Sequence, residues 1–347
     1  MQRTIVHLIH SGGFYGAERM LLDHCQQVPG KHRVLFLDAP AALLERFRQA
    51  GISCDSVHGI KALLENLHAQ PGVLNAHNFR AQVYAWIAAI RLRLPLLLTQ
   101  HGFTPSSLKQ RLYTWFSLQL CRTRTVKTVA CVARSIALLH EQAGISPGKL
   151  VVIPNGLPEA SSHRDASPRQ LIGFVGRLSH EKGPDLFLDA ILPLCSQRPG
   201  LHAVMLGGGP LQASLQQRIQ SAGLEKQITL PGYQQNIPEW LSRLSVLVIS
   251  SRTEGTPMIL LEAMQAGVPV TSFAVGGIPD VLQNNATGLL VAPEDTVLLG
   301  SQVRLLLDDP TLADKLAQRA REHQHQEYNL NKLSERWTSL YNQVQGS

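Results

Sequence analysis

The sequence predicts an α/β protein built from two Rossmann-like domains. Strand-like apolar runs alternate with helical patterns through both halves of the 347-residue chain, and this alternation is typical of parallel βαβ units. The length is sufficient for two cores of ordinary size. A polar segment rich in serine and proline, PEASSHRDASPRQ, separates the two halves and is typical of a linker.

The first half is expected to contain seven strands, each a short apolar run, with helices between them. The strands are residues 5–10, 34–38, 54–58, 73–75, 96–99, 129–132 and 151–153. The helices are residues 18–25, 43–50, 60–68, 80–92, 108–122 and 134–143.

The second half repeats the pattern, beginning with strand, loop and helix in LIGFVGRLSHEKGPDLFLDAI. Further strands are expected at residues 203–206, 228–230, 246–249, 271–273 and 289–291. A last helical stretch, residues 330–344, carries Leu333, Trp337, Leu340 and Tyr341 at helical spacing. We therefore predict a first domain at residues 1–157, a second at 158–327, and a C-terminal helix at 328–347.

The composition is that of a globular protein, with 44% hydrophobic and 16% charged residues. The five cysteines include no C-x-x-C pair, which argues against a disulfide framework and a zinc site and favours a reducing cytoplasm. We expect no signal peptide, because the apolar start at residues 5–9 is short and runs into glycines. We expect no spanning helix, because arginines and a proline interrupt the most apolar region, residues 83–98.

The net charge of +7 is concentrated in the first half. Residues 1–165 carry 18 Lys+Arg against 9 Asp+Glu, a balance of +9, and the remainder carries 14 against 16, a balance of −2. No acidic residue occurs between Glu65 and Glu141, a segment that holds many lysines and arginines. This asymmetry predicts an acidic partner, either an anionic membrane surface or an acidic acceptor. Nucleic acid is not expected, because no recognised binding motif accompanies the charge.

Residues 107–124 combine apolar residues at helical spacing with basic residues at both ends. The apolar positions are Leu108, Leu112, Trp115 and Phe116. One interpretation is a helix of the domain core. The other is a surface that contacts anionic lipid, where aromatic and basic residues act together.

The first strand ends in HSGGFYGAER, where Gly12, Gly13 and Gly16 lie between a strand and a helix. A glycine-rich loop in this position is typical of phosphate binding, and Asp38 after the second strand resembles the acidic ribose ligand of a dinucleotide-binding domain. However, Ser11 stands where the G-x-G-x-x-G fingerprint has its first glycine. An NAD-dependent enzyme is therefore kept only as an alternative.

Two histidines, His77 and His101, each follow a predicted strand of the first half. A histidine in this position is often structural, but ligands of open α/β sheets bind at the carboxyl ends of the strands. Both residues are therefore candidates for a binding site.

The most informative stretch of the chain is SRTEGTPMILLEAMQAGVPV, residues 251–270. A strand leads into a polar turn, and a helical pattern starts near Pro257, a residue suited to a helix start. The unpaired backbone N–H groups of such a helix start, here around Thr256 to Ile259, attract a phosphate. Glu254 precedes the helix and Glu262 lies about two turns further on, where a diol such as a ribose is a suitable partner. Capping and surface charge remain the alternative explanation of both glutamates.

Arg177 and Lys182 lie on the loop after the first strand of the second half. Two cations at the carboxyl end of a strand suit a diphosphate, although isolated surface charges carry no such meaning.

These motifs together resemble the nucleotide-sugar site of family 4 of the retaining glycosyltransferases, which have the GT-B fold. The matching strings are E-G-x-P-x-x-L-L-E-A-M-x-A-G-x-P-V with G-G-I-P after it, F-V-G-R-x-x-x-E-K-G, T-x-H-G and the G-G…G-A-E-R loop. Asp280 departs from the glutamate usual after G-G-I-P. The resemblance implies two Rossmann-like domains facing a cleft and a C-terminal helix that returns to the first domain.

The resemblance also implies roles for residues. Catalysis would involve His101, Glu254, Arg177 and Lys182, with His101 reaching the donor sugar. Gly12 and His77 are the candidates on the acceptor side. The implied donor-binding residues are Gly13, Gly16, Arg177, Lys182, Gly232, Tyr233, Glu254, Gly255, Thr256, Pro257, Met258, Ile259 and Glu262.

The predicted activity is transfer of a hexose, with retention of its anomeric configuration, to a glycan or lipid-linked acceptor in cell-envelope or exopolysaccharide synthesis. The donor is expected to be a UDP- or GDP-sugar, UDP being the first choice. No cofactor and no metal are expected, because the chain has no D-x-D motif. The protein would be free in the cytoplasm or peripheral at the inner face of the membrane. The alternatives are a nucleotide-sugar epimerase of the same fold, the NAD-dependent enzyme, and a non-catalytic lipid- or nucleic-acid-binding protein.

Overall fold

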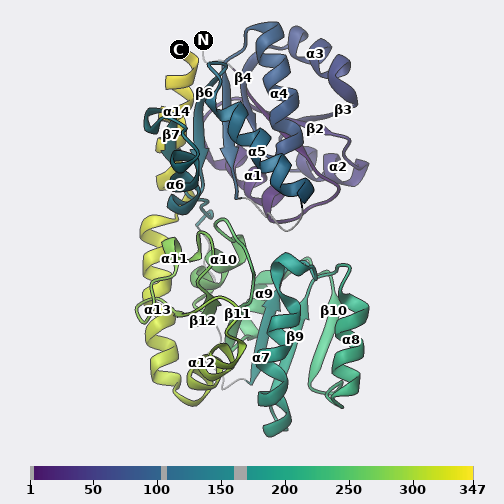
Figure 1. Cartoon of the computed structure of the whole chain (residues 1–347), viewed down its shortest axis with the longest axis vertical. Helices are drawn as coiled ribbons and strands as arrows, with labels where there is room; N and C mark the ends of the chain where they lie inside the picture. The colour runs from purple at the N-terminus through teal and green to yellow at the C-terminus, as the bar shows by residue number, and fades with distance from the viewer. Residues whose placement is uncertain (1–3, 103–107, 160–169, 347) are drawn as a thin grey trace. The chain divides into compact units, whose positions relative to one another are not determined.

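The computed structural model describes residues 4–102, 108–159 and 170–346, without the side chain of Lys109. The chain forms two compact units, Met1–Glu159 with Tyr328–Ser347 and Ala160–Glu327 (Figure 1). Each unit contains one parallel sheet flanked by helices, so the predicted α/β fold is confirmed. Most of the segment predicted as a linker, residues 160–169, lies outside the described residues.

The first unit is built on a seven-stranded sheet in the order β3-β2-β1-β4-β5-β6-β7, and every pair of neighbours is parallel. All the strands predicted from the sequence of this half form. They are β1 (Thr4–His10), β2 (His32–Leu37), β3 (Ser53–Val57), β4 (Gly72–Ala76), β5 (Leu96–Gln100), β6 (Val126–Cys131) and β7 (Leu150–Val152).

The helices of this unit follow the predicted order and cover both faces of the sheet. They are α1 (Gly16–Gln27), α2 (Ala41–Gln49), α3 (Gly59–Ala69), α4 (Phe79–Leu92), α5 (Leu108–Arg122), α6 (Arg134–Gln142), the 3-10 turn η1 (Pro147–Lys149) and α14 (Leu330–Gly346).

Helix α4 illustrates how local chemistry sets the ends of an element. Asn78 is its N-cap, and the Asn78 side chain accepts a hydrogen bond from the N–H of Ala81 at 3.3 Å. Arg93 ends the helix in the left-handed region, with φ of 52°. Pro95 follows and cannot continue a helix. The cap places the residue before it, His77, at the carboxyl end of β4.

The sheet of the first unit separates two apolar cores. Because alternate side chains of a strand point to opposite faces, Val6 and Leu8 of β1 enter one core while Ile5 enters the other. The second core also contains α14, through residues that include Leu333, Trp337 and Leu340. The predicted return of the C-terminal helix to the first domain is therefore confirmed.

Helix α14 also makes polar contacts inside that second core. The Tyr341 hydroxyl lies 2.9 Å from Nε2 of His24 and accepts a hydrogen bond from the Asn75 side chain at 3.1 Å. Asn75 in turn accepts a hydrogen bond from the Thr99 hydroxyl at 2.7 Å. All four residues are buried, so the helix is attached to the sheet by polar as well as apolar contacts.

The second unit has a six-stranded parallel sheet in the order β10-β9-β8-β11-β12-β13. Its strands are β8 (Leu171–Val175), β9 (His202–Leu206), β10 (Ile228–Gly232), β11 (Val246–Ile249), β12 (Val270–Phe273) and β13 (Leu289–Val291). Its helices are the 3-10 turn η2 (His180–Lys182), α7 (Pro184–Gln197), α8 (Gln212–Ser221), α9 (Ile237–Arg243), α10 (Met258–Ala266), α11 (Ile278–Val281), α12 (Thr296–Asp308) and α13 (Pro310–Glu327).

Both sheets reverse their strand order once, between β1 and β4 in the first unit and between β8 and β11 in the second. Ligands of open α/β sheets bind in the crevice that this reversal leaves at the carboxyl ends of the strands. Each unit therefore has one topologically favoured site, formed by the loops after these strands.

The contacts of Tyr341 generate a stability prediction. The Tyr341→Phe substitution is expected to lower the free energy of unfolding by about 1–3 kcal/mol, because it leaves buried polar partners without a hydrogen bond. Tyr84→Phe serves as control, since Tyr84 is half-buried and its hydroxyl has no recorded hydrogen bond among the described residues. Urea unfolding of both variants measures the effect, and equal losses would contradict a special role for the Tyr341 hydroxyl.

Candidate functional site

Lys182 and Glu254 form an ion pair at the carboxyl end of the second sheet. Lys182 ends η2, which follows β8, and Glu254 lies in the loop after β11. The Lys182 Nζ is 2.6 Å and 2.8 Å from the two carboxylate oxygens of Glu254. The Glu254 side chain is only 8% exposed, against 32% for Lys182. The structure thus brings two of the predicted residues together, at the point where the strand order reverses.

The loop that carries Glu254 is held from two sides. The Ser251 hydroxyl donates a hydrogen bond to Glu254 Oε1 at 2.7 Å. The N–H of Gly277 donates to the backbone carbonyl of Glu254 at 3.3 Å. Gly276 has φ of 54°, and a Cβ atom added there would lie 1.8 Å from the same carbonyl oxygen. Only glycine fits at this close approach, so the loop after β12 determines where Glu254 lies.

Arg252 joins three loops of the second unit. Its guanidinium donates to both carboxylate oxygens of Asp185 at 2.9 Å and 2.6 Å, to the His180 carbonyl at 2.8 Å and to Glu294 at 3.1 Å. Asp185 lies in the first turn of α7 and His180 in η2, so Arg252 ties the loop of Glu254 to the loop of Lys182. The sequence analysis did not identify this residue.

Helix α10 begins just after Glu254. Pro257 is its N-cap, with an extended backbone, and Met258 is its first residue. The backbone N–H groups of Met258 and Ile259 lie in the first turn, where the helix offers them no acceptor. The helix dipole adds partial positive charge at the same place. The predicted helix start is confirmed, with Pro257 one position before the first helical residue.

The remaining predicted residues around α10 differ in exposure. Thr256 is buried, Gly255 is half-buried, and Glu262 lies on α10 with a half-buried side chain. Both Thr256 and Glu262 have interaction partners within the protein.

Arg177 lies where the loops after β8 and β9 approach closely. A Cβ atom added at Gly207 would lie 2.0 Å from the Gly176 carbonyl oxygen, and one at Gly209 would lie 2.4 Å from that of Leu178. Arg177 is exposed. Its guanidinium forms no hydrogen bond with any residue that the structure describes, which leaves it available to an anion.

Gly232 and Tyr233 lie further from this site. Gly232 ends β10, the edge strand, and β9 separates β10 from β8 in the sheet. The Tyr233 side chain is 54% exposed. The carbonyl oxygen of Gly232 accepts a hydrogen bond from the N–H of Gly207 at 2.9 Å, so the end of β10 adjoins the loop after β9.

The glycine-rich loop of the first unit connects β1 to α1. Gly12 and Gly13 lie in the loop and Gly16 is the first residue of α1. Glu18 Oε2 accepts a hydrogen bond from the Tyr15 N–H at 2.9 Å, so Glu18 caps the helix start. A Cβ atom added at Gly12 would meet no atom within 4 Å, so this part of the loop has room for a ligand.

Asp38, the possible ribose ligand of a dinucleotide, is engaged by other residues. Its carboxylate lies 2.5 Å from the guanidinium of Arg80 and 2.8 Å from Nδ1 of His58. Asp38 also has a left-handed backbone, with φ of 57°. Local contacts therefore account for its carboxylate without a dinucleotide.

His77 and His101 are the first members of a row of four histidines. Nε2 of His101 lies 3.2 Å from Nδ1 of His77, and Nε2 of His77 lies 3.0 Å from Nδ1 of His7. Nε2 of His7 lies 3.0 Å from Nδ1 of His32. Nε2 of His32 ends the row, 2.9 Å from the carbonyl oxygen of Val28. We call this row the histidine chain.

Burial keeps the histidine chain uncharged at neutral pH. His7 and His77 are buried, and burial lowers the pKa of each well below its ordinary value. Burial also lowers the pKa of His32. His101 is half-buried as a residue, and loss of hydration around its imidazole lowers its pKa to about 4. Loss of hydration disfavours the imidazolium ion in all four cases.

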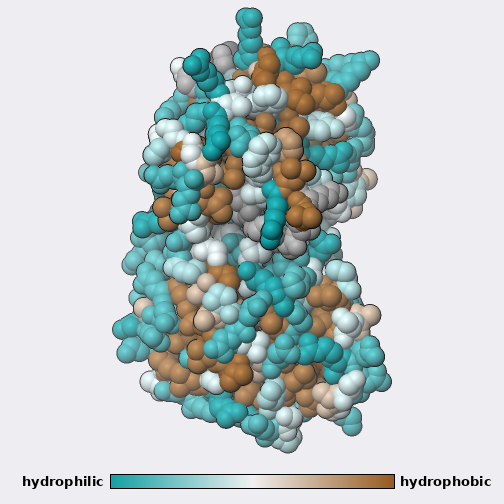
Figure 2. All heavy atoms as spheres, in the orientation of Figure 1, coloured by the Kyte–Doolittle hydropathy of each residue, from teal (hydrophilic) through white to brown (hydrophobic). Residues whose placement is uncertain are grey.

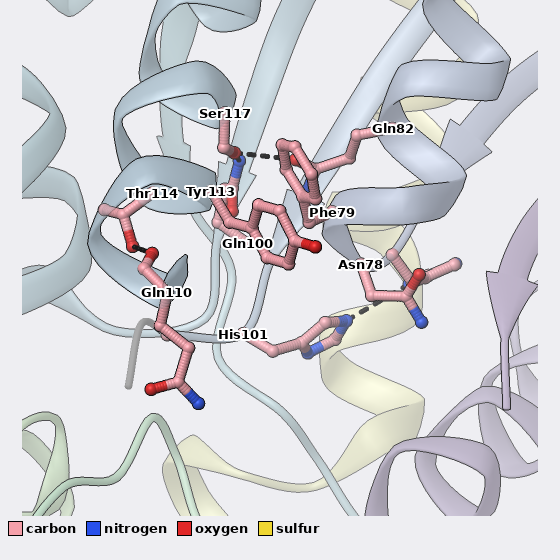
Figure 3. A pocket seen from close by; sticks show the side chains of 11 residues that line it. Asn78, Phe79, Gln82, Gln100, His101, Gln110, Tyr113, Thr114 and Ser117 are labelled. Atoms are coloured by element: carbon pink, nitrogen blue, oxygen red, sulfur yellow. Dashed lines mark hydrogen bonds between the residues drawn. The ribbon is translucent and has the colours of Figure 1, made fainter. Parts of the chain in front are cut away.

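A pocket of about 430 Å³ opens in the first unit beside His101 (Figure 3). Two of the predicted residues, His77 and His101, line it. The other lining residues are Asn78, Phe79, Gln82, Gln100, Gly102, Gln110, Tyr113, Thr114 and Ser117. None of them carries a charged carboxylate, ammonium or guanidinium group, so the lining suits a neutral ligand with hydroxyl or amide groups.

The wall of this pocket combines a polar network with an aromatic pair. The Ser117 hydroxyl donates to Gln82 at 2.7 Å and accepts from the Gln100 side chain at 3.2 Å. The rings of Phe79 and Tyr113 stack with centroids 4.5 Å apart and an interplanar angle of 16° (Figure 3). Groups that can hydrogen-bond to hydroxyls, placed beside a flat aromatic surface, are typical of sites that bind a ring with polar substituents and an apolar face.

Helix α5 forms one side of the pocket and exposes apolar residues. The exposed fraction is 83% for Leu108, 52% for Leu112, 53% for Trp115 and 46% for Phe116. Ser117 and Cys121 are its buried positions. Of the two interpretations of this segment, the core helix does not hold for the apolar stripe, because the stripe is exposed. Figure 2 shows hydrophobic atoms gathered over the region where Figure 1 draws α4 and α5.

The basic residues near α5 differ in exposure and in their hydrogen bonds. Arg111 and Arg124 are exposed. Arg122 donates hydrogen bonds to the carbonyl of Ala143 and to Gln119, which ties the end of α5 to the end of α6. The side chain of Lys109 lies outside the described part. No helix in the described ranges is long and apolar enough to cross a membrane.

The sequence analysis missed several residues of these sites because they resemble ordinary residues of strands and helices. His7 and His32 stand in strands that are otherwise apolar, and Phe79 and Tyr113 resemble ordinary helix residues. A polar residue inside a buried strand requires a partner, and this was the available signal for His7 and His32. Nothing in the sequence indicated that the four histidines adjoin one another.

Two family models match the chain, one on each side of residue 160. The model described as Glycosyltransferase Family 4 matches residues 14–160. The model described as Glycosyl transferases group 1 matches residues 159–323. Together they span nearly the whole described chain.

Similar proteins include a lipopolysaccharide core biosynthesis mannosyltransferase of Rhizobium meliloti, 35% identical over 42% of this chain and 44% of the relative. The chain thus spans less than half the length of that relative. Another is an N-acetylgalactosaminyltransferase of Campylobacter jejuni named for an acceptor glycan on PP-undecaprenol, 25% identical over 75% of this chain and 71% of the relative. HepE from Anabaena, solved in complex with UDP and glucose, superposes with a TM-score of 0.89 at 20% identity, over 99% of this chain and 100% of that one.

The close approach at Gly276 predicts a steep cost of substitution. Gly276→Ala is expected to lower the free energy of unfolding by about 3–5 kcal/mol, because the new methyl group meets the Glu254 carbonyl oxygen and the backbone is left-handed. Gly223→Ala is the matched control, since Gly223 has φ of 69° but open space around it, and we expect it to cost about 1–2 kcal/mol. Urea unfolding followed by circular dichroism compares the two. Equal losses would mean that the clash does not hold the loop.

Proposed function

The chain belongs to the family 4 glycosyltransferases, and from this premise we propose that it is a retaining enzyme that uses a nucleoside-diphosphate sugar. The observation that carries the proposal is the Lys182 and Glu254 pair at the strand-order reversal, next to the start of α10. The transferred group would be a hexose, delivered to a glycan or lipid-linked acceptor.

The diphosphate of the donor is assigned to the second unit. Positive charge is supplied by the backbone N–H groups of Met258 and Ile259 and by the guanidinium of Arg177, which forms no hydrogen bond with a described residue. Lys182 attracts the diphosphate less strongly than an unpaired lysine would, because the carboxylate of Glu254 offsets much of its positive charge. These groups would stabilise the negative charge that develops on the departing diphosphate, and such stabilisation is usually the largest single term in catalysis.

Glu254 is assigned to orienting the sugar rather than to attacking it. Lys182 engages both of its carboxylate oxygens and Ser251 engages one of them, which reduces the nucleophilicity of the carboxylate. We therefore propose that the acceptor attacks from the face that the diphosphate leaves, with the leaving phosphate assisting the removal of the acceptor proton. Glu262 is assigned to the ribose, and Gly232 and Tyr233 to the base, as the family resemblance implies.

The donor nucleotide is proposed to be UDP. HepE, which has the same fold as this chain, is solved in complex with UDP and glucose and with UDP-glucose. No metal ion is invoked, because Arg177, Lys182 and the start of α10 provide the positive charge that a metal would otherwise supply.

The pocket of the first unit is assigned to a sugar ring of the acceptor, with Gly12 and His77 on the acceptor side. The uncharged lining, the polar network of Gln82, Gln100 and Ser117, and the stacked aromatic pair support this assignment. His101 is assigned to a hydroxyl of the transferred sugar, as the resemblance implies.

The apolar stripe of α5 supports a peripheral association with an anionic membrane. Trp115 and Phe116 are exposed beside Arg111, and this combination of aromatic and basic residues is typical of interfacial helices. A lipid-linked acceptor would be presented at such a surface. The names of the two similar transferases, one for lipopolysaccharide core and one for a PP-undecaprenol glycan, are consistent with a role in envelope synthesis.

The assignment of the diphosphate is tested by Arg177→Ala and Lys182→Ala. Arg177→Ala is expected to weaken UDP binding and to lower kcat/KM by about 2–3 kcal/mol of transition-state free energy without changing stability. Lys182→Ala is expected to impair both activity and stability, because it leaves the largely buried Glu254 carboxylate without its cation. Calorimetry with UDP, transfer kinetics and urea unfolding separate these effects.

Lys226→Ala is the control for this test, since Lys226 is an exposed cation of the same unit and is expected to leave all three measurements unchanged. Combining Lys182→Ala with Glu254→Gln should restore stability but not activity. Wild-type turnover in Arg177→Ala and Lys182→Ala would refute the assignment, and loss of activity in EDTA would refute the metal-free scheme.

The membrane assignment is tested by sedimentation with vesicles. The wild-type protein is expected to bind phosphatidylglycerol vesicles, and Arg111→Gln with Arg124→Gln should weaken binding roughly 30-fold, at about 1 kcal/mol for each cation. Trp115→Ser should weaken it as well. Arg122 is left unchanged because it ties α5 to α6.

The matched control changes Lys315 and Arg319, two exposed cations of α13, to glutamine and should not affect vesicle binding. High salt should abolish binding, because the Debye length falls from ~10 Å at 0.1 M to ~3 Å at 1 M. Equal behaviour of the wild type with anionic and neutral vesicles would overturn the membrane assignment.

A further inference from the structure

The histidine chain ends on an atom that can only accept a hydrogen bond. Nε2 of His32 lies 2.9 Å from the carbonyl oxygen of Val28, so Nε2 of His32 carries the proton. A neutral imidazole has one protonated and one unprotonated nitrogen. Nδ1 of His32 is therefore an acceptor, and this choice is imposed by the backbone of the loop after α1.

The donor and acceptor roles of the other rings in the histidine chain then follow one ring at a time. Nδ1 of His32 accepts from Nε2–H of His7, which leaves Nδ1 of His7 as an acceptor. That atom accepts from Nε2–H of His77, and Nδ1 of His77 accepts from Nε2–H of His101. Each contact joins one donor to one acceptor only if all four rings have the same tautomer.

We propose that the histidine chain, anchored on the Val28 carbonyl, holds His101 as the Nε2–H tautomer and makes its Nδ1 a hydrogen-bond acceptor for a ligand hydroxyl. None of the described residues forms a hydrogen bond with Nδ1 of His101. His7, His32 and His77 are then positioning residues, because they act on a ligand through His101.

The chemical consequence concerns the kind of ligand that His101 recognises. An acceptor nitrogen pairs with a hydroxyl or N–H donor and disfavours a carbonyl or a deprotonated phosphate, whose oxygens only accept. A sugar hydroxyl satisfies this requirement. The identification of the partner as a sugar rests on the proposed function, whereas the tautomer itself does not.

A buried metal site would give the opposite arrangement. His7, Cys25 and His32 place potential ligand atoms within 4.8 Å of one another. A metal bound to Nε2 of His7 would move the His7 proton to Nδ1, and the proton would then be on Nδ1 of His77 and of His101. Burial raises the pKa of the Cys25 thiol, which disfavours the thiolate that a metal needs.

The test is nuclear magnetic resonance of protein labelled at histidine with nitrogen-15. Long-range correlations between ring protons and ring nitrogens distinguish protonated from unprotonated nitrogens. In the wild type we expect Nε2–H tautomers for all four rings of the chain. A protonated Nδ1 on His101, or a stoichiometric metal ion found by elemental analysis, would overturn the proposal.

Two substitutions of the anchor sharpen the test. His32→Gln is expected to keep the direction, because a glutamine amide can donate to Val28 while its oxygen accepts from His7. His32→Leu removes the acceptor for His7, so part of the population at His7, His77 and His101 should change to the Nδ1–H tautomer. His140→Leu is the control, since His140 is buried and bonded to the Ile136 carbonyl outside the chain. His101 with wild-type tautomers in His32→Leu would refute the proposal.

Kinetics link the tautomer to the ligand. In His32→Leu we expect kcat/KM for transfer to fall roughly tenfold to a hundredfold, because an unmatched donor at His101 costs one buried hydrogen bond. His32→Gln and His140→Leu should remain close to the wild type. Changed tautomers with unchanged kinetics would refute the role of His101 Nδ1 in recognition. If the protein transfers no sugar at all, the proposed function fails. The nuclear magnetic resonance measurement still shows whether the four rings of the histidine chain are Nε2–H tautomers.

Discussion

The site of the second unit depends on one partly buried ion pair, formed by Lys182 and Glu254. The two residues come from loops that follow neighbouring strands, β8 and β11, so their attraction joins the two sides of the strand-order reversal. Arg252 reinforces the same junction through Asp185, and Gly276 closes it from the third side. These contacts hold the loop before α10 from several sides, so Lys182, Glu254 and the start of α10 are fixed by the protein's own contacts. Such preorganisation is what electrostatic catalysis needs.

The first unit buries polar residues in a sheet that is covered on both faces. His7, His24, His32 and Asn75 lie inside an otherwise apolar core. They are stabilised only because each finds a hydrogen-bond partner among the others, in Tyr341 or in the backbone. A network of this kind is sensitive to the loss of any member, and it connects the C-terminal helix to the pocket at the opposite end of the histidine chain.

The two units also divide the chemistry by charge. The second unit collects cations and backbone N–H groups, which suit a diphosphate. Among the described residues that line the pocket of the first unit, none carries a charged carboxylate, ammonium or guanidinium group, which suits neutral hydroxyl groups. The excess positive charge of the first unit lies elsewhere, at exposed positions such as Arg111 and Arg124. Its sequence asymmetry therefore concerns the outer surface of the unit and not the pocket.

The sequence by itself determined the order and type of the elements, because apolar periodicity and helix-start residues such as Pro257 are local properties. Motifs at strand ends also made Lys182, Glu254, His77 and His101 candidates for a site. Only the tertiary structure decided that Lys182 pairs with Glu254, that the stripe of α5 faces solvent, and that His7 and His32 continue the row from His101. Those contacts join residues far apart in the chain. Local sequence patterns do not predict the strand order that brings these residues together.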